Sequence, residues 1–337
     1  MLIKQTLSFC TTCYKRIPAD ICVEAGRVVM HKTCSEHGQH SGVVEPDAKF
    51  YGQCMAAPTR GIYGGYLMDV TARCNLACKY CYRGQENGPD PTIANLLQEA
   101  QVSRYTLPII VTGGEPTLRG DLPKLIHELC AIFPHQVTML TNAVKLDEGL
   151  LRELVPLLTT ADGVLHINVS MHPESKGADV RLLEMVAAMG LRVESALFVV
   201  DNFGGIDDAV ATTRKYAPAI AATRIKAVSR LWSEQKPEIA NKIYTSEMLD
   251  HVTDCYDAQP IWWANNKPSF FNVLIDGSHY MLVSWYDATN VDLLDINCPP
   301  LYRAKNGVAE NLVTAAIVNE GMAQGWLNGK RITTGDM

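Results

Sequence analysis

From about residue 62, short apolar segments alternate with helical ones, and this alternation limits the possible folds more than any other feature of the chain. Parallel strands need long crossover connections, usually helices, so the pattern predicts an α/β fold with a parallel sheet. One expected helix is marked by apolar residues that recur at helical spacing, from Leu122 and Leu125 to Phe133. Another begins near Asp90, the expected cap, with Pro91 in its first turn. The expected strands are residues 66–70, 108–112, 136–141, 164–170, 192–200 and 222–228.

Size and composition are those of a globular protein with room for one large domain and small additions. The chain has 337 residues, of which 47% are hydrophobic and 20% charged. No apolar run approaches the roughly 20 residues that span a bilayer, and no apolar segment follows Lys4, Lys15 and Arg16, so neither a membrane helix nor a signal peptide is expected. The net charge of −6 disfavours stable binding to nucleic acid. Eleven cysteines then suggest metal and cluster ligation in the reducing cytoplasm.

Three cysteines follow the first expected strand at the spacing Cys74-x3-Cys78-x2-Cys81. Thiolates are the ligands of cubic [4Fe–4S] clusters, and three of them leave the fourth iron without a protein ligand. An open position on a metal is where a small molecule binds and reacts, as in catalytic zinc sites. The spacing is not the paired pattern of a zinc knuckle. This cluster therefore favours an enzyme.

Two further motifs lie at the ends of the next expected strands. Gly113-Gly114-Glu115-Pro116 follows the apolar run 108–112, and Thr141-Asn142 ends the run 137–142. Together with Cys74-Asn-Leu-Ala-Cys78-Lys-Tyr-Cys81, and in the same order, these motifs resemble the signatures of the radical S-adenosylmethionine (SAM) superfamily. Ala143 stands where that family usually has the glycine of Thr-Asn-Gly.

The resemblance implies a partial (β/α)6 barrel with its chemistry at the carboxyl ends of the strands. In this family SAM chelates the open iron through its amine and carboxylate, and a reducing partner such as a flavodoxin or ferredoxin supplies the electron that cleaves it. The residues that it implies for SAM binding are Tyr80, Gly113, Gly114, Glu115, Pro116, Asn142, Asn168 and Ser170.

The end of the fourth strand departs from the family pattern. The chain has Ser170-Met-His172-Pro where relatives often have Ser-x-Asp-Gly, so the ribose contact stays open between Asn168 and Ser170. His172 either faces the substrate or is a surface histidine. At the end of the sixth strand, Arg224 and Lys226 are expected to be solvated rim charges, with pairing to an anion as the alternative.

A second metal site is predicted near the N-terminus. Cys10-x2-Cys13 and Cys34-x2-His37 flank two β-rich runs that join at Ala25-Gly26, and the hairpin would bring the pairs together. Four such ligands suit a closed structural zinc site. Three alternatives remain open: Cys22 or His31 in place of His37, iron in place of zinc, or no metal at all. This segment also resembles the N-terminal part of the radical SAM subgroup that includes tetraether lipid synthase.

The predicted domains are a zinc-ribbon-like lobe at 1–58, the radical SAM partial barrel at 59–230 and an α+β extension at 231–337 that closes the substrate site. In the extension we expect a helix at 245–258, a hairpin at 270–284 that turns at Asp276-Gly277, and a helix at 308–327. Cys54, Cys255 and Cys298 are too few to favour an auxiliary cluster, and Cys255 is expected to be buried.

The leading functional hypothesis is a radical SAM enzyme that takes hydrogen from an unactivated carbon of a lipid or small molecule. Modification of a ribosomal peptide is the alternative within the family. A non-catalytic Fe–S and zinc scaffold, or redox partner, is the alternative of another class, and modification of tRNA is disfavoured by the acidic net charge.

Overall fold

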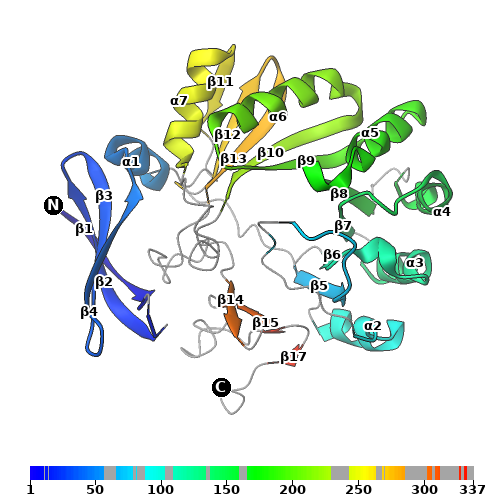
Figure 1. The fold of residues 1–337 in the computed structure, drawn as a ribbon, viewed down its shortest axis with the longest axis horizontal. Coiled ribbons are helices and arrows are strands. Elements are labelled where there is room, and N and C mark those ends of the chain that lie inside the picture. The colour runs from blue at the N-terminus through cyan, green and yellow to red at the C-terminus, as the bar shows by residue number, and fades with distance from the viewer. Residues whose placement is uncertain are drawn as a thin grey trace.

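The fold was obtained as a computed structural model (Figure 1). It describes residues 1–10, 12–13, 15–56, 66–78, 81, 88–102, 109–133, 137–158, 165–228, 243–262, 268, 270–284, 302–305, 308–311, 326–327 and 330–331. The expected domain boundaries after residues 58 and 230 lie outside these ranges.

The N-terminal lobe is a four-stranded antiparallel sheet in chain order, formed by β1 (Leu2–Phe9), β2 (Arg16–Glu24), β3 (Arg27–Cys34) and β4 (Gly38–Glu45). The predicted hairpin is β2–β3, and its turn uses positive φ at both Ala25 and Gly26. Helix α1 (Ala48–Ala56) follows this sheet and packs Phe50 against the extension of the barrel. The lobe lies beside the open side of the larger sheet (Figure 1).

The six predicted barrel strands are confirmed. They are β5 (Tyr66–Thr71), β6 (Ile109–Gly113), β7 (Val137–Thr141), β8 (Leu165–Met171), β9 (Val193–Val200) and β10 (Ile220–Ala227), all parallel and neighbours in chain order. The outer side carries α2 (Ile93–Val102), α3 (Leu122–Ile132), α4 (Glu148–Leu158), α5 (Ala178–Ala188) and α6 (Phe203–Lys215), which follow the curved sheet in an arc (Figure 1). Short 3-10 helices occur at η1 (Pro116–Leu118), η2 (Pro173–Ser175) and η3 (Ala217–Ala219). The fold is therefore the expected α/β class.

The main core lies between this sheet and its outer helices. The strand residues that belong to it therefore show which face of a strand points outward. Met68, Val111, Met139 and Ile167 pack in one buried cluster with the apolar faces of α3, α4 and α5. Successive side chains of a strand point to opposite faces. The alternate positions, which include Asn168 and Ser170, therefore lie on the concave inner face.

The C-terminal extension continues the barrel sheet. The predicted hairpin is confirmed as β12 (Phe270–Ile275) and β13 (Ser278–Val283), with positive φ at Asp276 and Gly277. Strand β13 pairs in parallel with β10, and β11 (Ala258–Ile261) ends the nine-stranded sheet. Helix α7 (Thr245–Cys255) ends three residues before the predicted limit, because Ala258 starts β11.

The predicted helix at 308–327 is wrong at both ends. Strand β14 (Tyr302–Lys305) pairs with β15 (Val308–Asn311), and β16 (Trp326–Leu327) pairs with β17 (Lys330–Arg331). An Asn-Gly dipeptide lies between the two strands of each pair, at Asn306-Gly307 and Asn328-Gly329. This dipeptide is the strongest short hairpin signal, and it outweighs helical spacing.

Candidate active site and metal centre

The cysteine loop begins where β5 ends, at the carboxyl rim of the sheet. Cys74 and Cys78 are half-buried and Cys81 is exposed. Burial, together with the charges of Glu174, Cys81 and Cys74, raises the pKa of the Cys78 thiol to about 11. Burial likewise raises the pKa of Cys74, with Glu115 and Cys81 adding to the effect. The three predicted ligands thus lie within electrostatic range of one another, whereas Tyr80 lies outside the described residues.

The glycines of Gly113-Gly114-Glu115-Pro116 bring this motif into backbone contact with the start of the cysteine loop. Gly114 N donates to Thr71 O and Glu115 N donates to Arg73 O, both at 2.8 Å. A Cβ at position 113 would lie 2.2 Å from Thr71 O, and one at position 114 would lie 2.1 Å from Arg73 O. Only glycine permits this approach. The two signature motifs are therefore joined directly through their backbones.

Glu115 connects the same motif to the end of β7. The residue is 1% exposed, and its carboxylate accepts hydrogen bonds from Thr117 N at 3.1 Å, Thr117 Oγ1 at 2.6 Å, Thr141 Oγ1 at 2.7 Å and Asn142 N at 2.7 Å. Burial raises the pKa of Glu115, while these hydrogen bonds lower it. Pro116 is buried and opens η1. The buried carboxylate of Glu115 thus joins the second and third signature motifs through hydrogen bonds.

Asn142 and Asn168 extend the site along the rim. The Asn142 side chain donates to Asn75 Oδ1, inside the cysteine loop, at 2.8 Å. Next to it, Ala143 adopts a φ of 64°, in the left-handed region that favours glycine. Asn168 is 7% exposed, and its Oδ1 has no hydrogen-bond partner among the described residues. Ser170, two residues further on the same face, is half-buried. An unsatisfied buried acceptor calls for a donor, and a ribose hydroxyl of SAM has that chemistry.

His172 lies against the cysteine loop. One ligand atom each from His172, Glu174 and Cys78 lie within 4.8 Å of one another, and burial lowers the pKa of His172. The surface alternative for His172 is thereby disfavoured. Lys226 also differs from the solvated rim charge that the sequence suggested. Its side chain is half-buried, and burial lowers its pKa to about 7.

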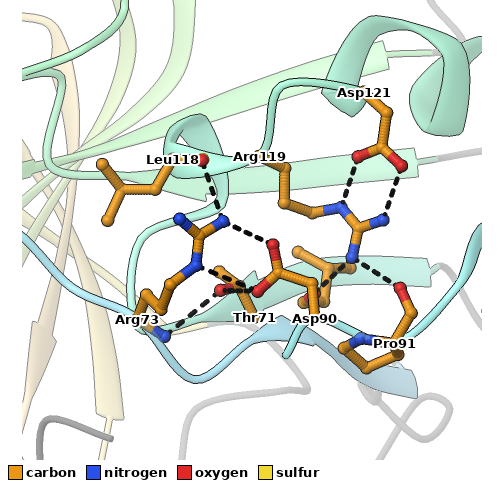
Figure 2. Close-up of polar contacts among 8 residues, drawn as sticks. Thr71, Arg73, Asp90, Pro91, Leu118, Arg119 and Asp121 are labelled. Carbon is orange, nitrogen blue, oxygen red and sulfur yellow. Dashed lines mark hydrogen bonds and ion pairs between the residues drawn. The ribbon is translucent and has the colours of Figure 1, made fainter. Parts of the chain in front are cut away.

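Asp90 does not cap α2 as predicted. Thr92 Oγ1 instead accepts from Asn95 N at 3.2 Å, and α2 begins at Ile93. The Asp90 carboxylate accepts from Thr71 Oγ1 at 2.6 Å and from Arg73 Nη2 at 2.5 Å (Figure 2). The sequence pattern missed this contact, since an aspartate shortly before a helix is normally its cap.

The predicted N-terminal ligands come together at one end of the small sheet. Ligand atoms of Cys10, Cys13, Cys34 and His37 all lie within 4.8 Å of one another. Cys13 Sγ is 3.9 Å from Cys34 Sγ, and His37 Nδ1 lies 3.5 Å from Cys34 Sγ and 3.7 Å from Cys10 Sγ. Tetrahedral zinc with Zn–S bonds of about 2.3 Å requires edges of roughly 3.5–3.8 Å. The spacing and the donor chemistry therefore fit zinc.

Electrostatics at this end of the sheet also favour a cation. Burial opposes ionisation of Cys10, but backbone N–H groups of Cys13 and Thr12 outweigh it and lower its pKa to about 6. Cys22 and His31 do not join the group, and His31 Nε2 instead lies 2.7 Å from Glu24. His40, which the sequence pattern missed, places Nε2 3.9 Å from Cys10 Sγ.

The remaining cysteines form no third site in the described part of the chain. Cys54 is buried on α1, and Cys255 is exposed at the end of α7, contrary to the burial predicted for it. Neither belongs to a group of three potential ligands there. Cys298 lies outside the described residues. No helix in the described ranges is long and apolar enough to cross a membrane.

Known families match both parts of the chain. Residues 68–177 match the model of the Radical SAM superfamily, and residues 2–45 match that of the HMPTM N-terminal zinc ribbon domain. Residues 68–177 thus carry a radical SAM domain, and the N-terminal lobe carries a zinc ribbon domain of the HMPTM type. The barrel domain implies a [4Fe–4S] cluster and SAM as cofactors, and the ribbon implies zinc or iron.

Curated relatives match over part of their length. A 7,8-dihydro-6-hydroxymethylpterin dimethyltransferase of Methanocaldococcus jannaschii is 32% identical over 177 residues, 42% of this chain and 35% of the relative. A probable GTP 3′,8-cyclase of Sulfolobus acidocaldarius is 33% identical over 121 residues, 34% of this chain and 37% of the relative. The chain thus spans little more than a third of the length of these relatives. Among solved structures, Streptococcus suis SuiB bound to precursor peptide SuiA has a TM-score of 0.45 and 16% identity, covering 62% of this chain and 48% of that one.

Proposed function

We propose that this protein is a radical SAM enzyme that cleaves SAM reductively and takes a hydrogen atom from an unactivated carbon of a small-molecule or lipid substrate. Cys74, Cys78 and Cys81 hold the [4Fe–4S] cluster in this proposal. When bound, the cluster supplies the electron that breaks the C5′–S bond of SAM, which leaves as methionine and, after hydrogen abstraction, 5′-deoxyadenosine. A flavodoxin or ferredoxin of the cytoplasm is the proposed electron source.

The proposal rests mainly on one observation. The backbone of the Gly-Gly-Glu-Pro motif donates two hydrogen bonds to the first residues of the cysteine loop, to Thr71 O and Arg73 O. The arrangement fixes the loop that would hold the cluster relative to the strand ends that would hold SAM. Such positioning, with exclusion of water, is what the protein contributes when the cofactor performs the difficult chemistry.

The SAM contacts are assigned to the residues of the same rim. The Oδ1 of Asn168, which has no partner among the described residues, is the better candidate for the ribose, because Asn168 is more deeply buried than Ser170. Asn142 is held between Glu115 and the cysteine loop and so faces the cluster end of SAM. Gly113, Gly114 and Pro116 shape the strand end beside it, and Tyr80 is assigned to the adenine on the family resemblance alone.

A small-molecule substrate is favoured over a peptide by the names of the relatives. The two curated relatives are named for a hydroxymethylpterin and for GTP, both small molecules. The carbon that is attacked and the final product are left to experiment.

The zinc ribbon is proposed to have a structural role. Cys10, Cys13, Cys34 and His37 would close a tetrahedral site with no position left for a substrate. The metal would add folding free energy to that of the apolar residues that the lobe buries, such as Ile21 and Met30.

The function is tested by anaerobic reconstitution with iron and sulfide, followed by addition of SAM and dithionite and quantification of 5′-deoxyadenosine by mass spectrometry. Cys78→Ala should abolish its formation, whereas the matched Cys255→Ala, at the exposed end of α7, should not. Equal production by wild type and Cys78→Ala would contradict the proposal. A protein that holds a cluster but yields no 5′-deoxyadenosine under any condition would support the non-catalytic scaffold instead.

A further inference from the structure

Two arginines bind both ends of the cysteine loop (Figure 2). The loop leaves β5 after Thr71 and rejoins regular structure at α2, which begins at Ile93. Arg73 lies at its first end and Asp90 at its second end. Arg119 comes from the segment that follows η1, and so from the Gly-Gly-Glu-Pro side of the rim. Neither arginine belongs to the signature motifs identified from the sequence.

The first contact closes the loop on itself. Arg73 donates to Asp90 with Nε at 3.2 Å and Nη2 at 2.5 Å, in the two-pronged geometry that fixes both distance and orientation. Thr71 Oγ1 donates to the same carboxylate at 2.6 Å. Arg73 Nη2 also donates to Leu118 O at 3.0 Å, which connects the closed loop to η1. Asp90 thus joins the first and last residues of the loop through three hydrogen bonds.

The second contact crosses the same gap from the opposite side. The Arg119 side chain is 2% exposed, and its Nη1 donates to Val70 O at 2.7 Å and to Pro91 O at 2.9 Å. These carbonyls lie immediately outside the two ends of the loop. Asp121 accepts from Nε and Nη2 of Arg119, both at 2.9 Å, and so neutralises the guanidinium. A buried arginine is costly unless its donors are satisfied, and here its four hydrogen bonds go to β5, to Pro91 ahead of α2 and to Asp121.

We propose that Arg73, Asp90 and Arg119 form a clamp that closes the cysteine loop at both ends and positions its thiolates for the cluster and for SAM. They are positioning residues, because they act through the loop and touch none of the reacting atoms. The inference rests on the proposed function. Its physical basis is that a loop with fixed ends has lost much of its conformational freedom before any metal binds. A displacement of about 1 Å at a reacting centre can lower a rate a hundredfold.

The test uses the full-length reconstituted protein with Asp90→Asn and Thr71→Val, which remove the charge and the hydroxyl from the clamp. Arg73→Lys keeps the charge but loses the two-pronged geometry. Arg152→Gln is the matched control, because it breaks an exposed pair with Glu148 on α4, far from the loop in the chain. Iron content, zinc content, thermal unfolding, kcat and the KM for SAM in 5′-deoxyadenosine formation are measured for each.

We expect Asp90→Asn to lower kcat/KM for SAM, or the iron content, by about ten- to a hundredfold, the range set by loss of one hydrogen bond to a charged group. Zinc content should not change, and Arg73→Lys should fall between wild type and Asp90→Asn. The clamp is contradicted if Asp90→Asn and Thr71→Val both keep the iron content and kcat/KM of the wild type. It is also contradicted if these variants lose thermal stability without any change in iron content or kcat/KM.

The two proposals fail differently. If Asp90→Asn does not fold, Thr71→Val decides the question, since it removes a hydroxyl and keeps the ion pair. If the wild type itself forms no 5′-deoxyadenosine, the proposed function is contradicted, and the clamp is then judged by iron retention alone.

Discussion

Gly114→Ala is the perturbation whose effect can be worked out most directly from the structure. The added Cβ would lie 2.1 Å from Arg73 O and 2.5 Å from Arg73 C, and contacts below 3.0 Å are essentially never observed. The motif and the cysteine loop must therefore separate by about 1 Å. The 2.8 Å hydrogen bonds from Gly114 N and Glu115 N then lengthen to roughly 3.8 Å, beyond hydrogen-bond range. Two such bonds contribute about 1 kcal/mol each, so a loss of at least roughly 2 kcal/mol is expected.

The same shift displaces the residue next to Cys74, the first proposed cluster ligand. A displacement of this size lowers rates about a hundredfold, so 5′-deoxyadenosine formation should fall far more than stability alone requires. The assay compares iron content, rate and thermal midpoint of Gly114→Ala with those of Gly120→Ala, where an added Cβ meets nothing within 4 Å. If both variants retain the wild-type rate and iron content, the backbone contact does not position the loop, and the reasoning fails.

Three further outcomes are expected. In Glu115→Gln, the new amide N–H group either faces the backbone N–H of Asn142 or takes the place of the oxygen that accepts from the other donors. The free energy of unfolding in denaturant titrations should therefore fall by about 3 kcal/mol, and a change below about 1 kcal/mol would contradict this. Burial raises the pKa of Glu45 from 4.5 to about 7, so its contribution to stability is largest below pH 4.5 and is lost as the pH rises through 7. Glu45→Gln should therefore gain roughly 3 kcal/mol relative to wild type between pH 4.5 and pH 8 in urea titrations, and a pH-independent difference would exclude this assignment. Cys34→Ser should lose zinc but keep iron by metal analysis, whereas Cys22→Ser should keep both; unchanged zinc in the first variant would remove Cys34 from the site.

The barrel strands could be predicted because each is a short apolar run followed by a helix with clear apolar spacing. Once the parallel order is known, the carboxyl ends must share one rim, and this brings the cysteine loop, Glu115 and Asn142 together. The N-terminal ligand group followed from hairpin geometry in the same way. Local patterns of this kind depend on few neighbouring residues, so the sequence alone was enough to predict these strands and this ligand group.

The contacts that cross between segments could not be predicted. Asp90 has the position of a helix cap, and only the approach of Arg73 and Thr71 in the folded chain gives it another partner. Cys255 has the helical spacing of a buried residue, but α7 ends there, so the thiol is exposed. At Asn306-Gly307 a turn signal lies directly before the predicted helix at 308–327, and β14 and β15 pair on either side of it.

The most direct test of the account is electron paramagnetic resonance of the dithionite-reduced protein, recorded with SAM labelled with 15N at its methionine amine. The account predicts a [4Fe–4S] signal that changes on addition of SAM and shows hyperfine coupling to the labelled nitrogen, because SAM occupies the iron that Cys74, Cys78 and Cys81 leave open. A reduced cluster whose spectrum is identical with and without SAM, and that shows no such coupling, would contradict it.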